Sequence, residues 1–252
     1  MQKIKAISIS NRKGIRKNNV AEAMLIKDFG LENDAHAGKW HRQVSFLAEE
    51  SIETMRAKGL DVVAGNFAEN ITTEGVDLAR LPVGSHLKIG KTELIISQLG
   101  KICHTRCAIY HQAGDCVMPR EGIFAVVIEG GRIKVGDTVT ISGKRSKAAA
   151  FVGEKDAVSS YGDTVVSLIK TNFGPAFVRV DTISTREGGN LSAILKDLTE
   201  TQKIEDIIIY DPAGGLGLAL AGLERKKGSE HRYLLGDSTI HYCRQMEQID
   251  KA

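Results

Sequence analysis

Residues 83–97 read VGSHLKIGKTELIIS, and this stretch decides how the first half of the chain is expected to fold. Leu87 and Ile89 alternate in front of Gly90, and Leu94 and Ile96 alternate behind it. Apolar residues at every second position on both sides of a glycine turn are typical of a β-hairpin with one buried face. The stretch therefore predicts two paired strands.

The same pattern recurs through residues 1–142. Alternation at 7–9, a continuous apolar run at 123–128 and alternation around Gly136 predict further short strands. One helix is expected in 45–59, because Ala48, Ile52 and Met55 share a face there. Many short strands joined by regular turns are typical of a barrel, so we expect residues 1–142 to form a mostly-β, barrel-like domain.

The chain changes character after residue 142. Residues 143–150 are small and basic, which predicts a linker. Residues 151–252 then alternate between strand-like and helix-like patterns, which predicts a small α/β domain with a parallel sheet. We expect strands at 148–153, 176–184 and 205–210. We expect helices at 162–174 and 190–202, and a further helix-like stretch after DPAGGLG at 211–217.

Composition narrows the function classes. The chain has 252 residues, with 34 basic and 31 acidic side chains, and only 5% of its residues are aromatic. Such a balance argues against a nucleic-acid binder. The N-terminus has no apolar signal core, and no stretch approaches the roughly 20 apolar residues that span a bilayer. We therefore expect a cytoplasmic protein that binds neither nucleic acid nor membrane.

Three of the four cysteines, Cys103, Cys107 and Cys116, cluster in KICHTRCAIYHQAGDCVMPREGIF at 101–124, and Cys243 stands apart. Cys107 follows Arg106 directly, and a neighbouring cation favours the reactive thiolate. The cluster is open to four interpretations. It is a sulfur-carrying thiol with Cys103 or Cys116 as a resolving partner, a zinc site, an iron–sulfur site, or a set of ordinary buried cysteines.

Other polar stretches are weaker signals. GLENDAHAGKWHRQVSF at 30–46 places His36 and Arg42 in a glycine-bounded loop that is either an anion site or a solvated turn. NRKGIRKN at 11–18, with Lys17, reads as a solvated basic turn or a phosphate contact. In the second domain, Gly214 and Gly215 follow a buried strand, where backbone N–H groups either meet a phosphate or make a plain tight turn.

Six motifs in order resemble the MOSC family, named after the C-terminal domain of molybdenum cofactor sulfurase. They are KGIRKNNVAEA, GLENDAHAGKWHRQVSFLAEESI, GNFAENITTEG, LPVGSHLKIG, KICHTRCAIYHQAGDCVMPREGIFAVV and GGRIKVGDTV, and they extend over residues 3–141.

The resemblance implies a β-barrel-like fold, a transiently bound molybdenum cofactor (molybdopterin) and sulfur transfer. It singles out Cys107 as catalytic thiol and metal ligand, with His36, Arg42, Asn70, Arg106 and Arg120 facing the cofactor. Asn33 stands where a glycine is common in the family, and asparagine tolerates a positive φ.

Residues 151–252 more faintly resemble molybdopterin adenylyltransferase-like proteins, through YGDTVVSLIK and IIIYDPAGGLG. This resemblance implies that Gly214 and Gly215 bind the pterin phosphate. However, Leu216 replaces an expected threonine and the acidic segment after the loop is missing, so we expect a degenerate, cofactor-binding domain.

The sequence supports three functions. The first is a sulfur carrier, a sulfurtransferase acting on the molybdenum cofactor through a Cys107 persulfide or thiolate. Its expected partners are a molybdoenzyme apoprotein and a cysteine desulfurase. The alternatives are a cofactor-dependent reductase of N-hydroxylated compounds and a non-enzymatic binding or chaperone module.

Overall fold

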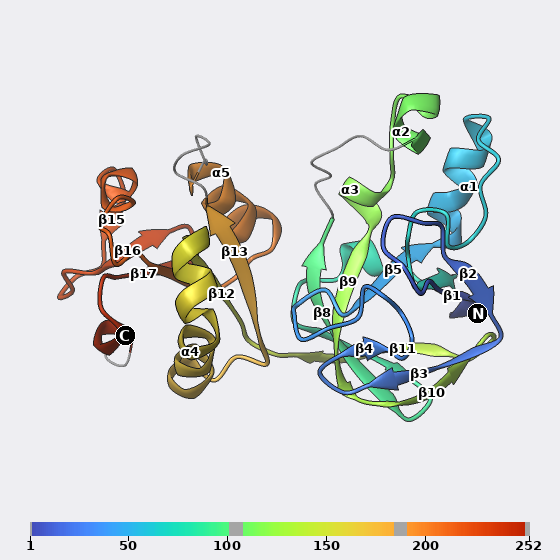
Figure 1. Cartoon of the computed structure of the whole chain (residues 1–252), viewed down its shortest axis with the longest axis horizontal. Coiled ribbons are helices and arrows are strands. Elements are labelled where there is room, and N and C mark those ends of the chain that lie inside the picture. Colours follow the sequence, from blue (N-terminus) through green and yellow to red (C-terminus); the bar gives the residue numbers. More distant parts are fainter. Residues whose placement is uncertain (1, 101–107, 184–190, 250–252) are drawn as a thin grey trace. The chain divides into compact units, whose positions relative to one another are not determined.

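The computed structural model describes residues 2–100, 108–183 and 191–249, and the chain divides into two compact units, Met1–Arg145 and Ser146–Ala252 (Figure 1). The boundary lies inside the expected linker. That segment is largely strand, however, because one strand ends at Arg145 and the next begins at Ala148.

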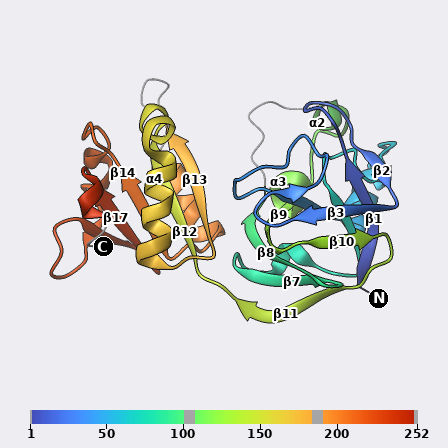
Figure 2. The same cartoon turned by 60° about the horizontal axis from the view of Figure 1, so that its bottom comes forward.

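Unit 1 is built on an eight-stranded sheet in the order β11-β7-β8-β9-β5-β6-β1-β2. A second sheet has the order β10-β3-β4, and Figure 2 shows β3 and β10 side by side. The strands are β1 (Lys3–Ile9), β2 (Asn18–Val20), β3 (Glu22–Ile26), β4 (Gly30–Leu31), β5 (Val44–Ala48), β6 (Ile71–Glu74), β7 (Ser85–Ile89), β8 (Thr92–Leu99), β9 (Ile123–Glu129), β10 (Gly131–Lys134) and β11 (Val139–Arg145).

The large sheet curls until its two ends meet. Lys3 of β1 forms a bridge with Thr138, directly before β11, although β11 stands at one end of the strand order and β1 stands next to the other end. The amide of Ile4 donates to Asp137 (2.9 Å), and that of Val139 donates to the carbonyl of Gln2 (3.1 Å). The expected barrel-like, mostly-β fold is thus confirmed.

The hairpin of residues 83–97 is confirmed. β7 and β8 pair antiparallel, with Leu87 opposite Leu94, and Gly90 has the positive φ of 59° that the tight turn requires. The expected helix is α1 (Glu49–Ala57), which buries Ser51, Ile52 and Met55. The shorter helices α2 (Ala108–Ala113) and α3 (Met118–Glu121) lie between β8 and β9 along the chain.

Unit 2 holds a six-stranded sheet in the order β13-β12-β14-β17-β16-β15. The first four strands in this order are parallel, and the last two are added antiparallel. The strands are β12 (Ala148–Glu154), β13 (Phe177–Ile183), β14 (Asp206–Tyr210), β15 (Glu224–Arg225), β16 (Arg232–Leu235) and β17 (Ser238–Cys243). The expected α/β fold is confirmed as a mostly parallel sheet.

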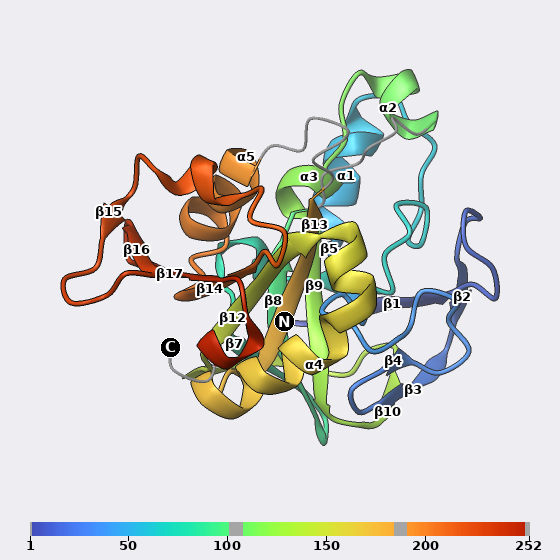
Figure 3. The same ribbon diagram turned by 60° about the vertical axis from the view of Figure 1, so that its left-hand side comes forward.

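Helices cover both faces of this sheet. Phe151 and Ile208 pack with α4 (Lys155–Phe173), and their strand neighbours Val152 and Ile207 pack with α5 (Leu191–Lys196). Figure 3 shows α4 lying across β12 and β13. Side chains that alternate along a strand point to opposite faces, so the near-continuous apolar runs of β12 and β14 supply both cores.

Two helix predictions in unit 2 need correction. The helix expected at 190–202 is α5 followed by a π-helical turn at Asp197–Thr201. The helix expected after 211–217 is wrong, because only a 3₁₀ turn forms, at Gly217–Leu220. Glycines weaken a helix by about 1 kcal/mol each, and this stretch contains Gly214, Gly215, Gly217 and Gly222.

No helix among the described residues is both long and apolar enough to cross a membrane.

Two leucines in unit 2 test its packing with the same substitution. Leu198 is fully buried and Leu218 is 88% exposed. We expect Leu198→Ala to lower the free energy of unfolding by about 2–5 kcal/mol, and Leu218→Ala to change it by less than about 0.5 kcal/mol. Urea denaturation of the whole chain, followed by circular dichroism, measures both. Equal effects would contradict the packing described here.

Candidate functional site

A cleft of about 130 Å³ lies in unit 1, where three stretches of the chain meet. These are the loop 30–43 with the start of β5, the loop 65–70 and the segment 118–124. Three of the residues singled out from the sequence share this cleft, namely His36, Arg42 and Asn70. The remaining lining residues are Trp40, Ser45, Phe67, Ala68, Met118 and Phe124.

A buried carboxylate holds the cleft together. The side chain of Asp34, 1% exposed, accepts hydrogen bonds from Lys17 Nζ (2.7 Å), the backbone amides of Ser10 (3.1 Å) and His36 (2.9 Å), and Asn70 Nδ2 (3.2 Å). Burial alone raises the pKa of Asp34, but the hydrogen bond and charge of Lys17 outweigh it, and the pKa lies below its usual range. Lys17 is thus a buried ion-pair partner, which corrects the prediction of a solvated turn.

His36 stands partly exposed at the cleft, with 32% of its side chain accessible. Its Nδ1 atom is buried and has no hydrogen-bond partner among the described residues, although Asp34 Oδ1 lies 3.4 Å away. Burial and the positive charge of Lys17 lower the pKa of His36. The imidazole is therefore neutral at pH 7, and one ring nitrogen can accept a hydrogen bond or a proton.

Arg42 supplies positive charge to the same cleft. Its guanidinium carbon lies 4.6 Å from the centroid of the Trp40 ring and 5.7 Å from that of Phe124. Cation–π contacts of this kind hold a guanidinium in place without neutralising its charge. The arrangement presents a fixed, planar cation with aromatic walls, which suits an anionic group carrying a flat ring.

Asn70 has a structural role in the described contacts. Its Nδ2 donates to the carbonyl of Ser8 (3.2 Å) and to Asp34, and its Oδ1 accepts from the amide (3.1 Å) and hydroxyl (2.9 Å) of Ser45. Next to it, Ala68 has a φ of 65°, a conformation that costs a non-glycine residue energy. Glu69 fixes this loop by accepting hydrogen bonds from the amides of Gly65 and Phe67.

Asn33, at the start of the cleft loop, has a φ of 62°. The prediction that asparagine supports the turn in place of glycine is confirmed.

Two further predicted site residues lie elsewhere in unit 1. Arg120 is outside the cleft lining and forms a two-pronged ion pair with Asp115 (2.9 and 3.0 Å), which Lys58 joins at 2.6 Å. These cations lower the pKa of Asp115. Cys116 is buried in the apolar cluster under α1, which limits its access to a sulfur donor.

Cys107 and Arg106 lie outside the described residues, as do Cys103 and His104. Their predicted roles stay predictions. Within the described residues, no group of three or more histidine, cysteine, aspartate or glutamate side chains is arranged to hold a metal ion.

The glycine loop of unit 2 binds a carboxylate of its own. Asp211, 1% exposed, accepts hydrogen bonds from the amides of Gly214 (2.9 Å), Gly215 (3.2 Å) and Leu216 (2.8 Å) and from the hydroxyl of Tyr242 (2.8 Å). Burial and the bond to Asp211 raise the pKa of Tyr242 to about 12. A phosphate at these amides would have to displace Asp211.

Cys243 also belongs to unit 2, where burial raises the pKa of its thiol to about 12. A thiol with so high a pKa is inert at neutral pH.

Comparison with known families supports the resemblance drawn from the sequence. A family model, the MOSC domain, matches residues 33–140. Unit 1 contains a MOSC domain. This domain family is associated with the molybdenum cofactor, and the matched region includes His36, Arg42 and Asn70 as well as Cys107. The similarity of residues 151–252 to molybdopterin adenylyltransferase-like proteins stays a prediction.

Three solved structures are similar to part of this chain. The YuaD protein of Bacillus subtilis is 17% identical, with a TM-score of 0.47, and the match covers 55% of this chain and 94% of that one. YiiM of Geobacillus stearothermophilus is 18% identical (TM-score 0.43; 56% and 75% covered), and so is YiiM of Escherichia coli (TM-score 0.43; 57% and 72% covered). No curated protein sequence matches the chain.

The sequence did not reveal the buried pair of Lys17 and Asp34 or the role of Trp40. A signal was present for the second, since Trp40 and Arg42 lie two residues apart in one loop. For the first, nothing local marks Lys17, because Arg12, Lys13 and Arg16 precede it in an equally basic run.

The pKa of His36 is a direct test of the cleft's electrostatics. NMR titration of the His36 ring should give a midpoint below the usual 6.5. Lys17→Met should raise that midpoint, because it removes a nearby cation and leaves Asp34 uncompensated. Lys27→Met, which removes an exposed lysine outside the cleft lining, should leave it unchanged. A midpoint of 6.5 or more in the unaltered protein would contradict this account.

Proposed function

We propose that the chain is a cytoplasmic sulfur-carrier protein of molybdenum cofactor maturation, which binds the cofactor at the cleft of His36 and Arg42. The observation that carries this proposal is Arg42, held against Trp40 at 4.6 Å inside a MOSC domain and beside a neutral His36. Its expected partners are a cysteine desulfurase as sulfur donor and a molybdoenzyme apoprotein as recipient.

The residues present fit such a cofactor. A pterin-based ligand offers a flat ring system and an anionic phosphate, and the cleft offers aromatic walls, a guanidinium and the partly exposed imidazole of His36. Its volume of about 130 Å³ matches one end of such a ligand rather than the whole. When bound, the cofactor supplies a molybdenum centre that accepts sulfur as a ligand.

The sulfur step is assigned to Cys107. Its thiolate attacks the terminal sulfur of a persulfide on the donor protein, a new S–S bond forms at Cys107, and the donor leaves as a thiolate. Arg106, next to it in sequence, favours the thiolate form before the attack. The persulfide then carries the terminal sulfur as an anion that Arg42 attracts toward the cleft.

Cofactor binding can be followed through Trp40, which is the only tryptophan of the chain and lines the cleft. We expect added molybdopterin to change Trp40 fluorescence saturably. Arg42→Met should weaken that affinity about tenfold or more, the usual effect of losing a charged hydrogen bond. Arg132→Met, which removes an exposed arginine paired with Glu22, is the matched control. Equal affinity of the Arg42→Met and Arg132→Met proteins would refute the assigned site.

Sulfur carriage is tested separately by mass spectrometry. After incubation with a cysteine desulfurase and cysteine, the unaltered chain should gain the mass of one sulfur atom. Cys107→Ala should gain none, whereas Cys243→Ala should behave like the unaltered chain, because Cys243 is buried with a raised pKa. Full sulfur uptake by Cys107→Ala would remove Cys107 from this role.

A further inference from the structure

A second cavity, of about 580 Å³, lies on the opposite face of the sheet from the cleft. Ser45 of β5 pairs with Phe124 of β9, and both line the cleft. The next pair along, Phe46 and Ile123, lines the cavity. Because neighbouring side chains on a strand point to opposite faces, these two pairs of residues lie on opposite sides of the sheet. Leu47, on the same side as Ser45, lines the cavity where it reaches α1.

The base of the cavity is apolar. Phe46 and Ile123 are almost fully buried there, and Val76 and Leu78, on the chain after β6, complete the base. A volume of about 580 Å³ is within the range of roughly 300–1,000 Å³ found for pockets that hold small molecules. An apolar part of a ligand is therefore accommodated at the base.

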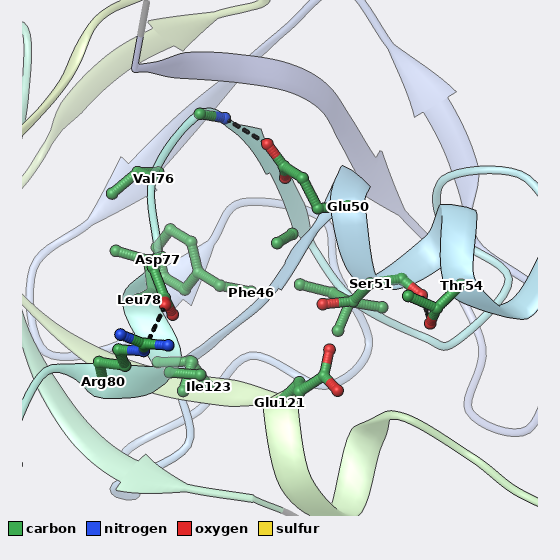
Figure 4. Close-up of a pocket in the computed structure, with 14 residues that line it drawn as sticks. Phe46, Glu50, Ser51, Thr54, Val76, Asp77, Leu78, Arg80, Glu121 and Ile123 are labelled. Atoms are coloured by element: carbon green, nitrogen blue, oxygen red, sulfur yellow. Dashed lines mark hydrogen bonds and ion pairs between the residues drawn. The ribbon is translucent and has the colours of Figure 1, made fainter.

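Hydrogen-bond acceptors dominate the polar part of the wall. The carboxylate of Glu121 forms no ion pair or hydrogen bond with any described residue, and Figure 4 shows it directed toward the helix that carries Ser51. Ser51 is 6% exposed, and among the described residues its Oγ has no partner either. Thr54 donates its hydroxyl proton to the Ser51 carbonyl (2.7 Å), so its oxygen is left only to accept.

The other charged groups at the cavity are already engaged. Glu50 accepts a hydrogen bond from the amide of Gly75 (2.7 Å), and Asp77 forms an ion pair with Arg80 (3.0 Å), as the dashed lines of Figure 4 mark. With three carboxylates and one guanidinium, the wall carries a net negative charge. Such a wall repels a phosphate or another anion and attracts a cation.

We propose that this cavity binds a small organic cation, an ammonium or amidinium group on an apolar body. The apolar body rests on Phe46, Val76 and Ile123, and the N–H donors meet Glu121 and the hydroxyl oxygens of Ser51 and Thr54. Because the wall of the cavity is negatively charged, it favours a cationic ligand, whereas the ligand proposed for the cleft is anionic. The two ligands are therefore different, and this inference does not depend on cofactor binding.

The probe that tests this is 2-phenylethylammonium, titrated into the full chain and followed by amide NMR shifts. Binding should be saturable, with the largest shifts at Ser51, Gly75 and Val76. The neutral analogue 2-phenylethanol, which has the same apolar body, should bind at least about tenfold more weakly, because it lacks the charged hydrogen bond. Equal binding of the amine and the alcohol, or no saturable binding of the amine, overturns the proposal.

A matched pair of variants tests whether Glu121 contacts the amine. Glu121→Gln keeps the shape of the side chain and should weaken amine binding about tenfold. Glu53→Gln changes an exposed carboxylate of α1 that does not line the cavity and should leave affinity unchanged. Thermal unfolding shows whether both variants are folded. A folded Glu121→Gln protein that binds the amine as tightly as Glu53→Gln does overturns the assignment.

Discussion

The buried carboxylate of Asp34 is the contact on which the cleft depends. It is bound at once by the end of β1 through Ser10, by the basic loop through Lys17, and by the loop before β6 through Asn70. An isolated buried charge is very unfavourable, and removing one partner of such a pair costs about 3–5 kcal/mol. Three loops far apart in sequence therefore have to assemble together around one anion. The position of His36 follows, because its amide is one of the four donors.

The same network sets the electrical character of the cleft. Burial and the positive charge of Lys17 together lower the pKa of His36. Lys17 itself is buried in its ion pair with Asp34, so it does not reach a ligand in the cleft. Arg42, stacked on Trp40, is the positively charged side chain among the described residues that line the cleft. On the other face of the sheet the balance is reversed, with carboxylates around an apolar base. One pair of strands, β5 and β9, thus separates two sites of opposite preference.

The spacing of apolar residues predicted most of the fold, because it indicates which side of a strand or helix is buried. The hairpin at Gly90, the helix with Ile52 and the runs of β12 and β14 follow from it directly. His36, Arg42 and Asn70 were found through motifs, since each lies in a distinctive polar loop.

Other features escaped the sequence because they depend on distant partners. Glu121 and Ser51 are ordinary residues until α1 and the end of α3 are brought together. Likewise, the sequence of the loop at Gly214 is compatible with phosphate binding by its backbone amides. In the structure these amides donate hydrogen bonds to Asp211 instead. The Lys17–Asp34 pair is of the same kind, since nothing local distinguishes a lysine that becomes buried from its exposed neighbours.

The closure of the barrel has a consequence for how the protein is made. Lys3 leaves the ribosome well before its bridge partner Thr138, which lies at the other end of unit 1, directly before β11. Contacts between residues so distant in sequence slow folding, because the loop must be closed before any stabilisation is gained. β2 pairs with the end of β1, at Ile7–Ile9, but the same edge of the strand at Lys3 stays unpaired until Thr138 is synthesised. Until then this edge is a site for wrong pairing between nascent chains.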